Sequence, residues 1–238
     1  MLNLIQGDCL QILDTLPKVK CIFADPPDNL NLNYDNYIDK RDDYYSWLEE
    51  IITKSFLKCS IFWLSYYHKH DLEIKNIFYN LMKKYPQREL RTFIWRFTFG
   101  QYREEDFASG YRPIIRVMRK DAITYPGNVR IVSDRMLLGD KRAAGLRVPD
   151  DVWEYSRVVG NSKERRTWHP TQHPEELMSR IIRFSCNKTE TFVDLFAGTG
   201  TSLIVCKDLR VPCIGIEQSS FYCSKINEEL GSCINYSH

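Results

Sequence analysis

Short apolar runs alternate with segments of helical spacing at both ends of this sequence, and this rhythm constrains the fold more than any other feature. Toward the N-terminus, strands are expected at 2–5, 21–24, 60–66 and 90–97 and helices at 7–16, 44–57 and 71–84. Toward the C-terminus, strands are expected at 191–195 and 212–216 and helices at 174–186, 201–209 and 219–230. The apolar run SIFWLSY at 60–66 is typical of a parallel strand covered on both faces. The alternation predicts an α/β fold with a doubly wound, mostly parallel sheet.

The alternation breaks down between residues 96 and 168. This stretch is rich in glycine and turn residues and holds 15 Lys and Arg against 10 Asp and Glu, whereas the whole chain carries a net charge of only +2. Positive charge gathered in one irregular region is expected of a surface that binds a polyanion, and a solvated insertion without a ligand fits the charge equally well. We therefore predict two halves of one sheet, 1–95 and 169–238, separated by an inserted region at 96–168.

Apolar run lengths and cysteine spacing argue against several other classes of protein. No apolar run approaches the ~20 residues that span a bilayer, and the N-terminus MLNLIQGDCL lacks the basic start of a signal peptide. None of the eight cysteines forms a C-x-x-C pair, and most lie in apolar runs, which favours buried free thiols. We expect a soluble protein of the cytoplasm or nucleoid with no metal ion and no membrane partner.

The stretch TFVDLFAGTGTS, residues 191–202, carries the strongest signal for a ligand. A strand ends at Asp194, and Gly198 and Gly200 separate it from the next helix, whose first N–H groups are unpaired. One strand later comes Glu217, a carboxylate placed to accept from both hydroxyls of a ribose. The spacing is neither that of a phosphate-binding P-loop nor G-x-G-x-x-G. Alone, G-T-G fits a tight turn equally well, but together with the two carboxylates it favours a nucleoside without a pyrophosphate, such as S-adenosylmethionine.

Four motifs in a distinctive order resemble the β-class of DNA amino-methyltransferases. They are G-D-C-L at 7–10, D-P-P at 25–27, H-P-T-Q-H-P-E-E-L at 169–177 and F-A-G-T-G-T at 196–201. Enzymes of this class transfer a methyl group from S-adenosylmethionine to N6 of adenine or N4 of cytosine. The resemblance implies a circularly permuted, Rossmann-like methyltransferase sheet with a target-recognition lobe at 96–168. It also implies double-stranded DNA as partner, a place in restriction–modification or DNA methylation, and, because members are often dimers, a homodimer.

The resemblance further implies a role for each motif residue. Asp8 would face the adenine of the cofactor, Glu217 would bind its ribose, and the segment at 169–172 would close over its methionine end. Read without the family, Asp8 fits a helix N-cap and His169 a simple turn. The full set of implied cofactor-binding residues is Asp8, Cys9, Asp25, His169, Pro170, Thr171, Gln172, Asp194, Phe196, Ala197, Gly198, Thr199, Gly200, Thr201, Glu217 and Gln218. The implied catalytic residues are Asp25, Pro26, Pro27, Asp28 and Tyr34.

The D-P-P motif suits an amine whose lone pair is delocalised into an aromatic ring. The Asp25 side chain and the Pro26 carbonyl would each accept one N–H and draw the nitrogen toward a tetrahedral geometry, on a backbone that proline holds rigid. Read alone, the motif is a strand terminator. The family usually carries an aromatic residue after D-P-P that stacks on the flipped-out base, a contact worth ~1–3 kcal/mol. Asp28 occupies that position here, so we expect Tyr34, and after it Tyr37, to replace the ring from a lid at 29–41, or Asp28 to contact the polar edge of the base.

The leading hypothesis is therefore a DNA methyltransferase, with adenine N6 favoured because Asp25 is more typical of adenine enzymes. The alternatives are a cytosine-N4 enzyme, a catalytically silent nucleic-acid-binding subunit, and a methyltransferase for RNA or a protein amide. Within 96–168, the basic residues expected to contact phosphates or bases are Arg103, Arg112, Arg116, Lys141, Arg142, Arg165 and Arg166.

Overall fold

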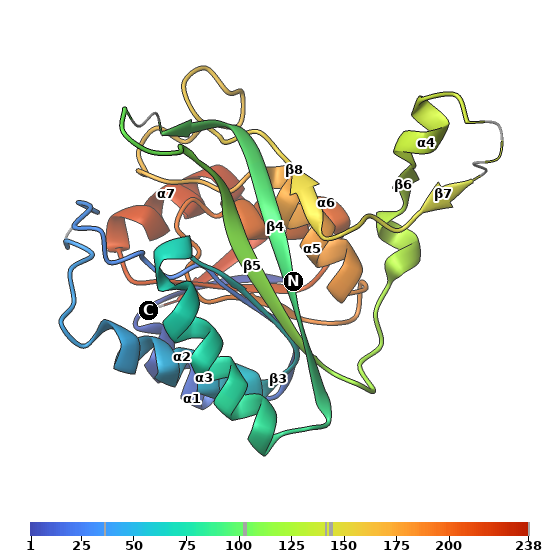
Figure 1. Cartoon of the computed structure of the whole chain (residues 1–238). Coiled ribbons are helices and arrows are strands. Elements are labelled where there is room, and N and C mark those ends of the chain that lie inside the picture. The colour runs from blue at the N-terminus through green and yellow to red at the C-terminus, as the bar shows by residue number, and fades with distance from the viewer. Residues whose placement is uncertain (36, 102–103, 141, 143–144, 238) are drawn as a thin grey trace.

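A large sheet with helices on both faces forms most of the molecule, shown in the computed structural model of Figure 1. The structure describes residues 1–35, 37–101, 104–140, 142 and 145–237. The strands of the sheet are β1 (Leu2–Gln6), β2 (Val19–Ala24), β3 (Cys59–Ser65), β4 (Arg88–Gln101), β5 (Ser109–Arg119), β8 (Val152–Glu154), β9 (Phe192–Asp194), β10 (Cys213–Glu217) and β11 (Ile234–Ser237). The helices are α1 (Cys9–Thr15), α2 (Tyr44–Lys58), α3 (Asp71–Lys84), α4 (Asp134–Leu137), α5 (Glu175–Ser185), α6 (Thr201–Leu209) and α7 (Ser220–Leu230), with 3-10 turns η1 (His68–His70), η2 (Pro126–Val129) and η3 (Gly231–Cys233).

The strand order confirms the predicted doubly wound sheet. Among the described residues the order is β11-β1-β10-β9-β2-β3-β5-β4-β8. Neighbours from β11 through β3 run parallel, whereas β5 is antiparallel to both β3 and β4. The last major parallel strands of the chain, β9 and β10, thus lie beside the first ones, β1 and β2, which is the arrangement expected of a circularly permuted sheet.

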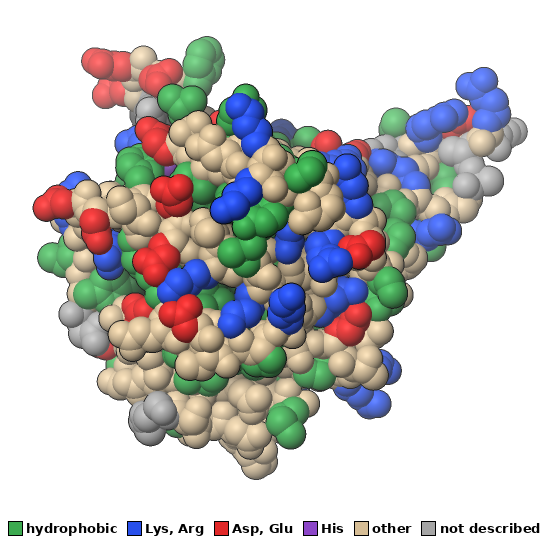
Figure 2. Space-filling model, turned by 90° about the horizontal axis from the view of Figure 1, so that it is seen from below, with side chains coloured by type: hydrophobic (Ala, Val, Ile, Leu, Met, Phe, Trp, Pro, Cys, Tyr) green, Lys and Arg blue, Asp and Glu red, His purple; other side chains and the backbone are tan. Residues whose placement is uncertain are grey.

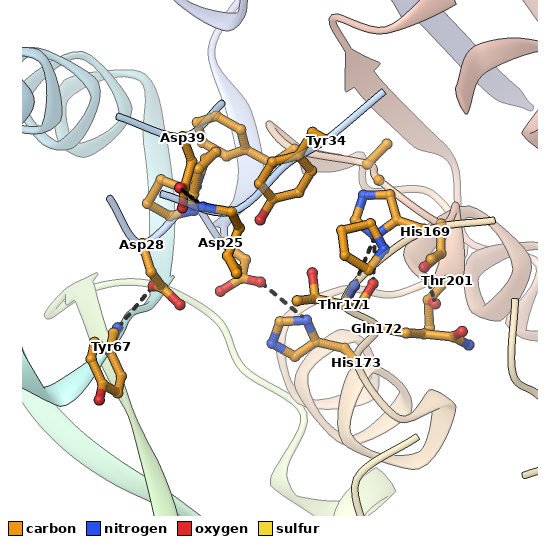
Figure 3. Close-up of a pocket in the computed structure, with 18 of the residues that line it drawn as sticks. Asp25, Asp28, Tyr34, Asp39, Tyr67, His169, Thr171, Gln172, His173 and Thr201 are labelled. Atoms are coloured by element: carbon orange, nitrogen blue, oxygen red, sulfur yellow. Dashed lines mark hydrogen bonds and ion pairs between the residues drawn. The ribbon is translucent and has the colours of Figure 1, made fainter. Parts of the chain in front are cut away.

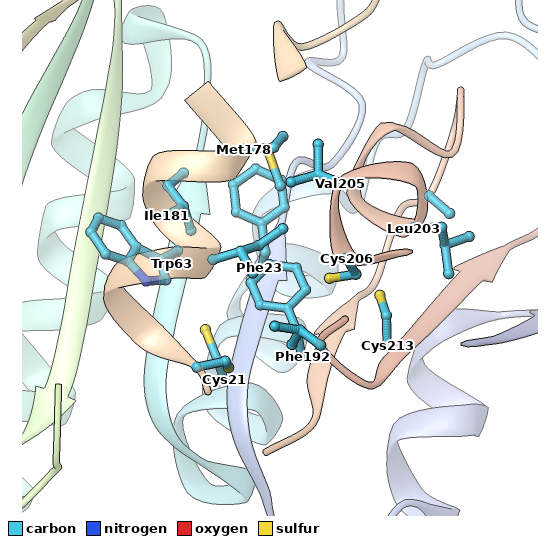
Figure 4. Packing of buried hydrophobic residues seen from close by; sticks show 14 of the residues in the cluster. Cys21, Phe23, Trp63, Met178, Ile181, Phe192, Leu203, Val205, Cys206 and Cys213 are labelled. Atoms are coloured by element: carbon cyan, nitrogen blue, oxygen red, sulfur yellow. The ribbon is translucent and has the colours of Figure 1, made fainter. Parts of the chain in front are cut away.

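Each face of the sheet buries its own apolar core, because successive side chains of a strand point to opposite faces. On β2, Cys21 and Phe23 pack against α5, α6 and α7, as Figure 4 shows for part of this cluster. Ile22 and Ala24 of the same strand pack on the other face against α1, α2 and α3. Burial on both faces explains the continuous apolar run of the central strands.

The region at 96–168 divides into strands of the main sheet and a projecting arm, so it is not a single insertion between two halves. β5 pairs with both β3 and β4, and β8 extends the sheet beside β4. The periodicity missed these strands because β5 carries Arg112, Arg116 and Arg119 within its apolar pattern. The arm spans residues 120–151, contains η2, α4 and the short pair β6 (Ile131–Val132) with β7 (Leu146–Arg147), and projects away from the sheet in Figure 1.

The described chain has no disulfide among its cysteines. All eight cysteines have free thiols there, seven of them buried and Cys233 exposed. None of the helices within that chain is both long and apolar enough to cross a membrane. The same residues include no cluster of three or more His, Cys, Asp or Glu that could hold a metal ion.

Candidate active site

The site lies where the chain leaves two neighbouring parallel strands in opposite directions. β9 pairs with β2, with Asp194 opposite Phe23, and the two strands end at the same edge of the sheet. The helix after β9, α6, packs on one face and the helix after β2, α2, packs on the other. Such a reversal opens a crevice at the carboxyl ends of the strands. Asp25 and the Gly198 loop therefore open onto one shared cavity of about 680 Å³.

Nearly all the residues predicted for the site line this cavity. The exception is Gly200, which lies behind the loop. It has a φ of +74°, and a Cβ there would lie 3.0 Å from two carbons of Ile226. The turn and its packing against Ile226 thus require glycine at 200. Gly198, with a φ of +50°, does line the cavity, and a Cβ there would lie 3.2 Å from His169 Nε2.

Glu217 ends β10 with its carboxylate fixed by backbone donors. Its Oε2 accepts from Gly198 N at 2.9 Å and its Oε1 accepts from Ser219 N at 2.8 Å. The side chain is only 9% exposed. Burial raises the pKa of Glu217 to about 7, although the hydrogen bonds from Ser219 and Gly198 oppose the rise. Each carboxylate oxygen keeps a second lone pair for a hydroxyl donor from a ligand.

Two further acids shape the cofactor side of the cavity by holding the backbone. Asp194 accepts from Phe196 N at 3.1 Å and from the Ser202 hydroxyl, and burial raises its pKa to about 6. Asp8 is the N-cap of α1, as the isolated sequence suggested, and accepts from two backbone N–H groups of the first turn. Because Asp8 also lines the cavity, the capping role and a contact with the cofactor are compatible.

His169 forms a neutral wall of the cavity beside the glycine loop. Its Nδ1 lies 2.6 Å from the Thr171 carbonyl oxygen, and its ring lies 4.5 Å from that of Tyr222 and 5.6 Å from that of Tyr34. Burial lowers the pKa of His169 to about 4, so the imidazole is uncharged near neutral pH. His169 is thus buried against the glycine loop, whereas Pro170 and Thr171, which also line the cavity, are exposed.

Asp25 stands at the tip of β2 between a guanidinium and an imidazole. Its Oδ1 accepts from Arg112 Nη2 at 2.7 Å, and its Oδ2 lies 3.3 Å from His173 Nδ1. Figure 3 shows Asp25 and His173 pointing toward each other across the cavity. Burial by itself raises the pKa of Asp25, but Arg112 and then His173 outweigh it and hold the pKa below its usual value. Asp25 is thus a carboxylate at neutral pH.

Both oxygens of the Asp28 carboxylate are engaged by other residues of the protein. Its two oxygens lie 2.7 and 2.9 Å from the nitrogens of Arg112, and Oδ1 also accepts from Tyr67 N at 3.1 Å. Its backbone carbonyl lies 2.8 Å from His70 Nε2. These contacts hold the fourth position of the D-P-P-D motif on the side of Arg112.

The loop after D-P-P carries two stacked tyrosines over the cavity. The rings of Tyr34 and Tyr37 lie 5.0 Å apart and almost parallel, at 6°. The loop is held by Asp39, which is 3% exposed and accepts from the backbone N–H groups of Leu30 and Leu32. In Figure 3 the Tyr34 hydroxyl is directed toward Asp25 and Thr171.

Several site residues were missed or misassigned by sequence reasoning. Arg112 was expected to contact DNA and is instead the ion-pair partner of Asp25 and Asp28. His173 was passed over, although it lies inside the motif H-P-T-Q-H that had been recognised. Tyr222, whose ring lies against that of His169, carries no local signal, since a tyrosine in a helix is ordinary.

The other basic residues that were expected to contact DNA differ in how deeply they are buried. Arg116 and Arg166 are 7% and 9% exposed and pair with Glu89 and with Glu175 and Glu229, so they support the fold. Arg165 lines the cavity. Arg142 is exposed on the arm, whereas Arg103 and Lys141 lie outside the described residues.

Comparisons with known proteins place the chain in a family. The chain matches the family model N6_N4_Mtase, described as DNA methylase, over residues 19–228. It is 30% identical to DNA adenine methyltransferase YhdJ of Escherichia coli K12, an alignment that covers 99% of this chain and 84% of YhdJ. It is 27% identical to the type II methyltransferase M.HpaI of Haemophilus parainfluenzae, covering 98% of this chain and 75% of M.HpaI.

Two solved structures show the same fold. The M1.HpyAVI–SAM complex superimposes with a TM-score of 0.64 at 20% identity, covering 97% of this chain and 100% of that one. PvuII DNA methyltransferase, cytosine-N4-specific, superimposes with a TM-score of 0.66 at 14% identity, covering 93% and 84% of the two chains. The family match over most of its length shows that the chain belongs to the N6_N4_Mtase family of DNA methylases, the S-adenosylmethionine-dependent amino-methyltransferases of DNA.

Proposed function

We propose that this enzyme methylates N6 of a flipped-out adenine in double-stranded DNA, with Asp25 and the Pro26 carbonyl as the two acceptors for the amine. The observation that carries the proposal is the single cavity onto which both Asp25 and the Gly198 loop open. An acceptor pair and a cofactor loop at opposite ends of the sheet could not act on one methyl group. Asp25 in place of serine supports adenine over cytosine, and the similarity to an adenine methyltransferase points the same way.

The cofactor side of the cavity fits S-adenosylmethionine. Gly198 leaves a concave surface that a Cβ would fill, Glu217 presents carboxylate lone pairs at the strand end, and neutral His169 adds no positive charge beside a cationic ligand. Asp8 and Cys9 would face the adenine end, and Thr171 and Gln172 the methionine end. When bound there, the cofactor supplies an electrophilic methyl group on a sulfonium.

The D-P-P side of the cavity is built to receive an amine. Asp25 is ionised, and its oxygens keep lone pairs beyond those used by Arg112 and His173. Within the described chain, no hydrogen bond to the Pro26 carbonyl is formed, so this acceptor is open to a substrate N–H. Two rigid acceptors stabilise a tetrahedral nitrogen without a reorganisation cost at the moment of transfer. The extra proton leaves only after the nitrogen has become cationic, so Asp25 need not be a strong base.

Tyr34 supplies the base-stacking ring that Asp28 cannot. It lies between Asp25 and His169 at the wall of the cavity, and its hydroxyl is directed toward the reacting end. The stacked Tyr37 supports its ring from behind. Removing the ring should therefore cost about 1–3 kcal/mol of base engagement.

The arm at 120–151 supports DNA as the polymer that the enzyme contacts. Arg130, Arg135 and Arg142 are exposed along it. Figure 2 shows mostly Lys and Arg side chains on the part that projects at the upper right. A protruding basic element can follow the phosphate backbone, which provides sequence-independent affinity. We assign target recognition to this arm, together with the rim of the cavity.

Mass spectrometry of nucleosides tests the proposal directly. DNA from cells expressing the wild-type enzyme should contain N6-methyladenine above the level in cells expressing Asp25→Ala. N4-methylcytosine instead would establish the cytosine alternative. No methylated base with purified enzyme, cofactor and mixed-sequence DNA would refute DNA methylation in favour of a silent subunit or a methyltransferase for RNA or a protein amide. Methylation by Asp25→Ala equal to wild type would refute the role of Asp25.

A matched pair of tyrosine variants tests the stacking residue. Tyr34→Ala should lower kcat/KM for DNA by about 5- to 160-fold, the equivalent of the ~1–3 kcal/mol of the lost stack. Tyr79→Ala, a 57% exposed tyrosine on α3 that does not line the cavity, should leave it unchanged. Equal values for the two variants would remove Tyr34 from the base site.

A further inference from the structure

Arg112 joins the two acids of the D-P-P-D motif into one ion-paired unit. One guanidinium nitrogen, Nη2, lies 2.7 Å from Asp25 and 2.9 Å from Asp28, and Nη1 lies 2.7 Å from Asp28. The third nitrogen, Nε, donates to the Ser65 hydroxyl at 2.8 Å. Ser65 in turn lies 3.3 Å from His173 Nε2, and His173 reaches back to Asp25. The result is a closed ring of polar contacts around the catalytic carboxylate.

The ring is partly buried and restricts how Asp25 can turn. The Arg112, Asp25 and Asp28 side chains are 16%, 22% and 17% exposed. A planar guanidinium with three occupied nitrogens has one orientation, unlike a flexible ammonium. Contacts on both carboxylate oxygens of Asp25 then define the direction in which its free lone pairs point.

We propose, resting on the function proposed above, that Arg112 is a positioning residue that sets the orientation and charge of Asp25. We further propose that Asp28 is the counter-ion that keeps Arg112 in place, not a contact for the base. Asp28 and Arg112 thus act as one paired unit. An aromatic side chain at 28 would leave Arg112 with a single carboxylate partner, and an arginine without Asp28 would be free to take other positions over Asp25.

The charges around Asp25 explain why Arg112 matters for its titration. Facing Asp25 are Arg112 from β5, His173 before α5, Asp28 and Tyr34 from its own loop, Tyr44 from α2 and Asp194 from β9. Burial lowers the pKa of His173, whereas that of Arg112 is raised by Asp25 and Asp28, so Arg112 is the permanent cation of the group. Without it, burial and the charge of Asp28 both act to raise the pKa of Asp25. A protonated Asp25 would offer the amine one fewer acceptor.

The test is the pH profile of methyl transfer by four variants, with S-adenosylmethionine and a duplex that the wild type methylates. For Arg112→Gln, the ratio of kcat at about pH 8 to kcat at about pH 6 should exceed that of the wild type, because a raised pKa of Asp25 lowers the ionised fraction at the acidic end of the range. Asp28→Asn keeps the cation but removes the carboxylate that holds it, so it should lower kcat and change the ratio less than Arg112→Gln does. The double variant, Arg112→Gln with Asp28→Asn, should have a ratio between those of Arg112→Gln and the wild type. The reason is that the negative charge of Asp28 no longer raises the pKa of Asp25. Arg112→Lys should keep the wild-type ratio but lower kcat about tenfold at every pH. The ammonium keeps the charge but lacks the planar, forked set of donors by which the guanidinium fixes Asp25.

Each outcome decides between the proposal and its failure. A matched control is Arg119→Gln, which removes an arginine of the same strand that pairs at the surface with Asp121 and should change neither kcat nor the ratio. A wild-type ratio in Arg112→Gln, or identical ratios in the single and double variants, would overturn the inference. Should Arg112→Gln have no measurable turnover, the lysine variant decides, since wild-type kcat there would show that the fork is not needed. A wild-type enzyme that does not methylate any duplex contradicts the proposed function itself, which separates the two failures.

Discussion

The affinity for S-adenosylmethionine should rise with pH through about pH 7, because of Glu217. In the structure this carboxyl is 9% exposed and its pKa is raised to about 7 by burial. Ribose hydroxyls donate to a carboxylate but meet a competing donor when the group is protonated. Binding therefore selects the ionised form and releases a proton. A group with a raised pKa is charged above that value, so the affinity is full above about pH 8 and is lost as the pH falls.

The size of the effect follows from the position of that pKa. About one Glu217 in eleven is ionised at about pH 6, and about ten in eleven at about pH 8. The Kd should thus be about tenfold weaker at the lower pH, a difference of about 1.4 kcal/mol. Proton release should fall from about 0.9 per cofactor bound at about pH 6 to about 0.1 at about pH 8.

Isothermal titration calorimetry measures both quantities when it is repeated in buffers of different ionisation enthalpy. Glu217→Gln is the control, because it keeps the shape of the side chain and its oxygen acceptor but cannot titrate. The titration of the cofactor's own amino group, and of Asp194 with its pKa of about 6, occurs in both proteins and cancels in the ratio of their Kd values. A ratio that does not change with pH would show that Glu217 does not bind the ribose as a carboxylate.

Three further perturbations have expected results. Asp25→Ala should abolish methyl transfer and leave the Kd for S-adenosylmethionine within a few-fold in calorimetry; a large loss of cofactor affinity would instead place Asp25 at the cofactor. Gly200→Ala should lower the free energy of unfolding by about 1–3 kcal/mol in urea titrations, because its φ is +74° and its new Cβ would lie 3.0 Å from Ile226. The Arg142 side chain is 87% exposed, so Arg142→Ala should lower the slope of log K for DNA binding against log salt concentration by about one, measured by fluorescence anisotropy. Arg116 is buried, so Arg116→Ala should mainly lower the free energy of unfolding. The reverse pattern would contradict the burial argument.

The order of strands and helices and the cofactor loop were predictable from the sequence, because both depend on neighbours in the chain. α3 and α6 have the bounds that the spacing of apolar residues predicted, and Gly198 with Glu217 line one cavity as expected. β5 was not predictable in the same way, since Arg112 and Arg116 interrupt its apolar pattern and are tolerated only because acids on other elements pair with them.

Only the tertiary structure decided what Asp28 does. Its partner Arg112 lies 84 positions away, and the two meet because β5 runs antiparallel to β3 in a register that brings Ile114 opposite Ser65. Local spacing carries information about which face of a strand a residue occupies, but not about which strand will lie beside it. The identity of an ion-pair partner across a sheet is therefore settled by strand order and register, which arise from the packing of the whole chain.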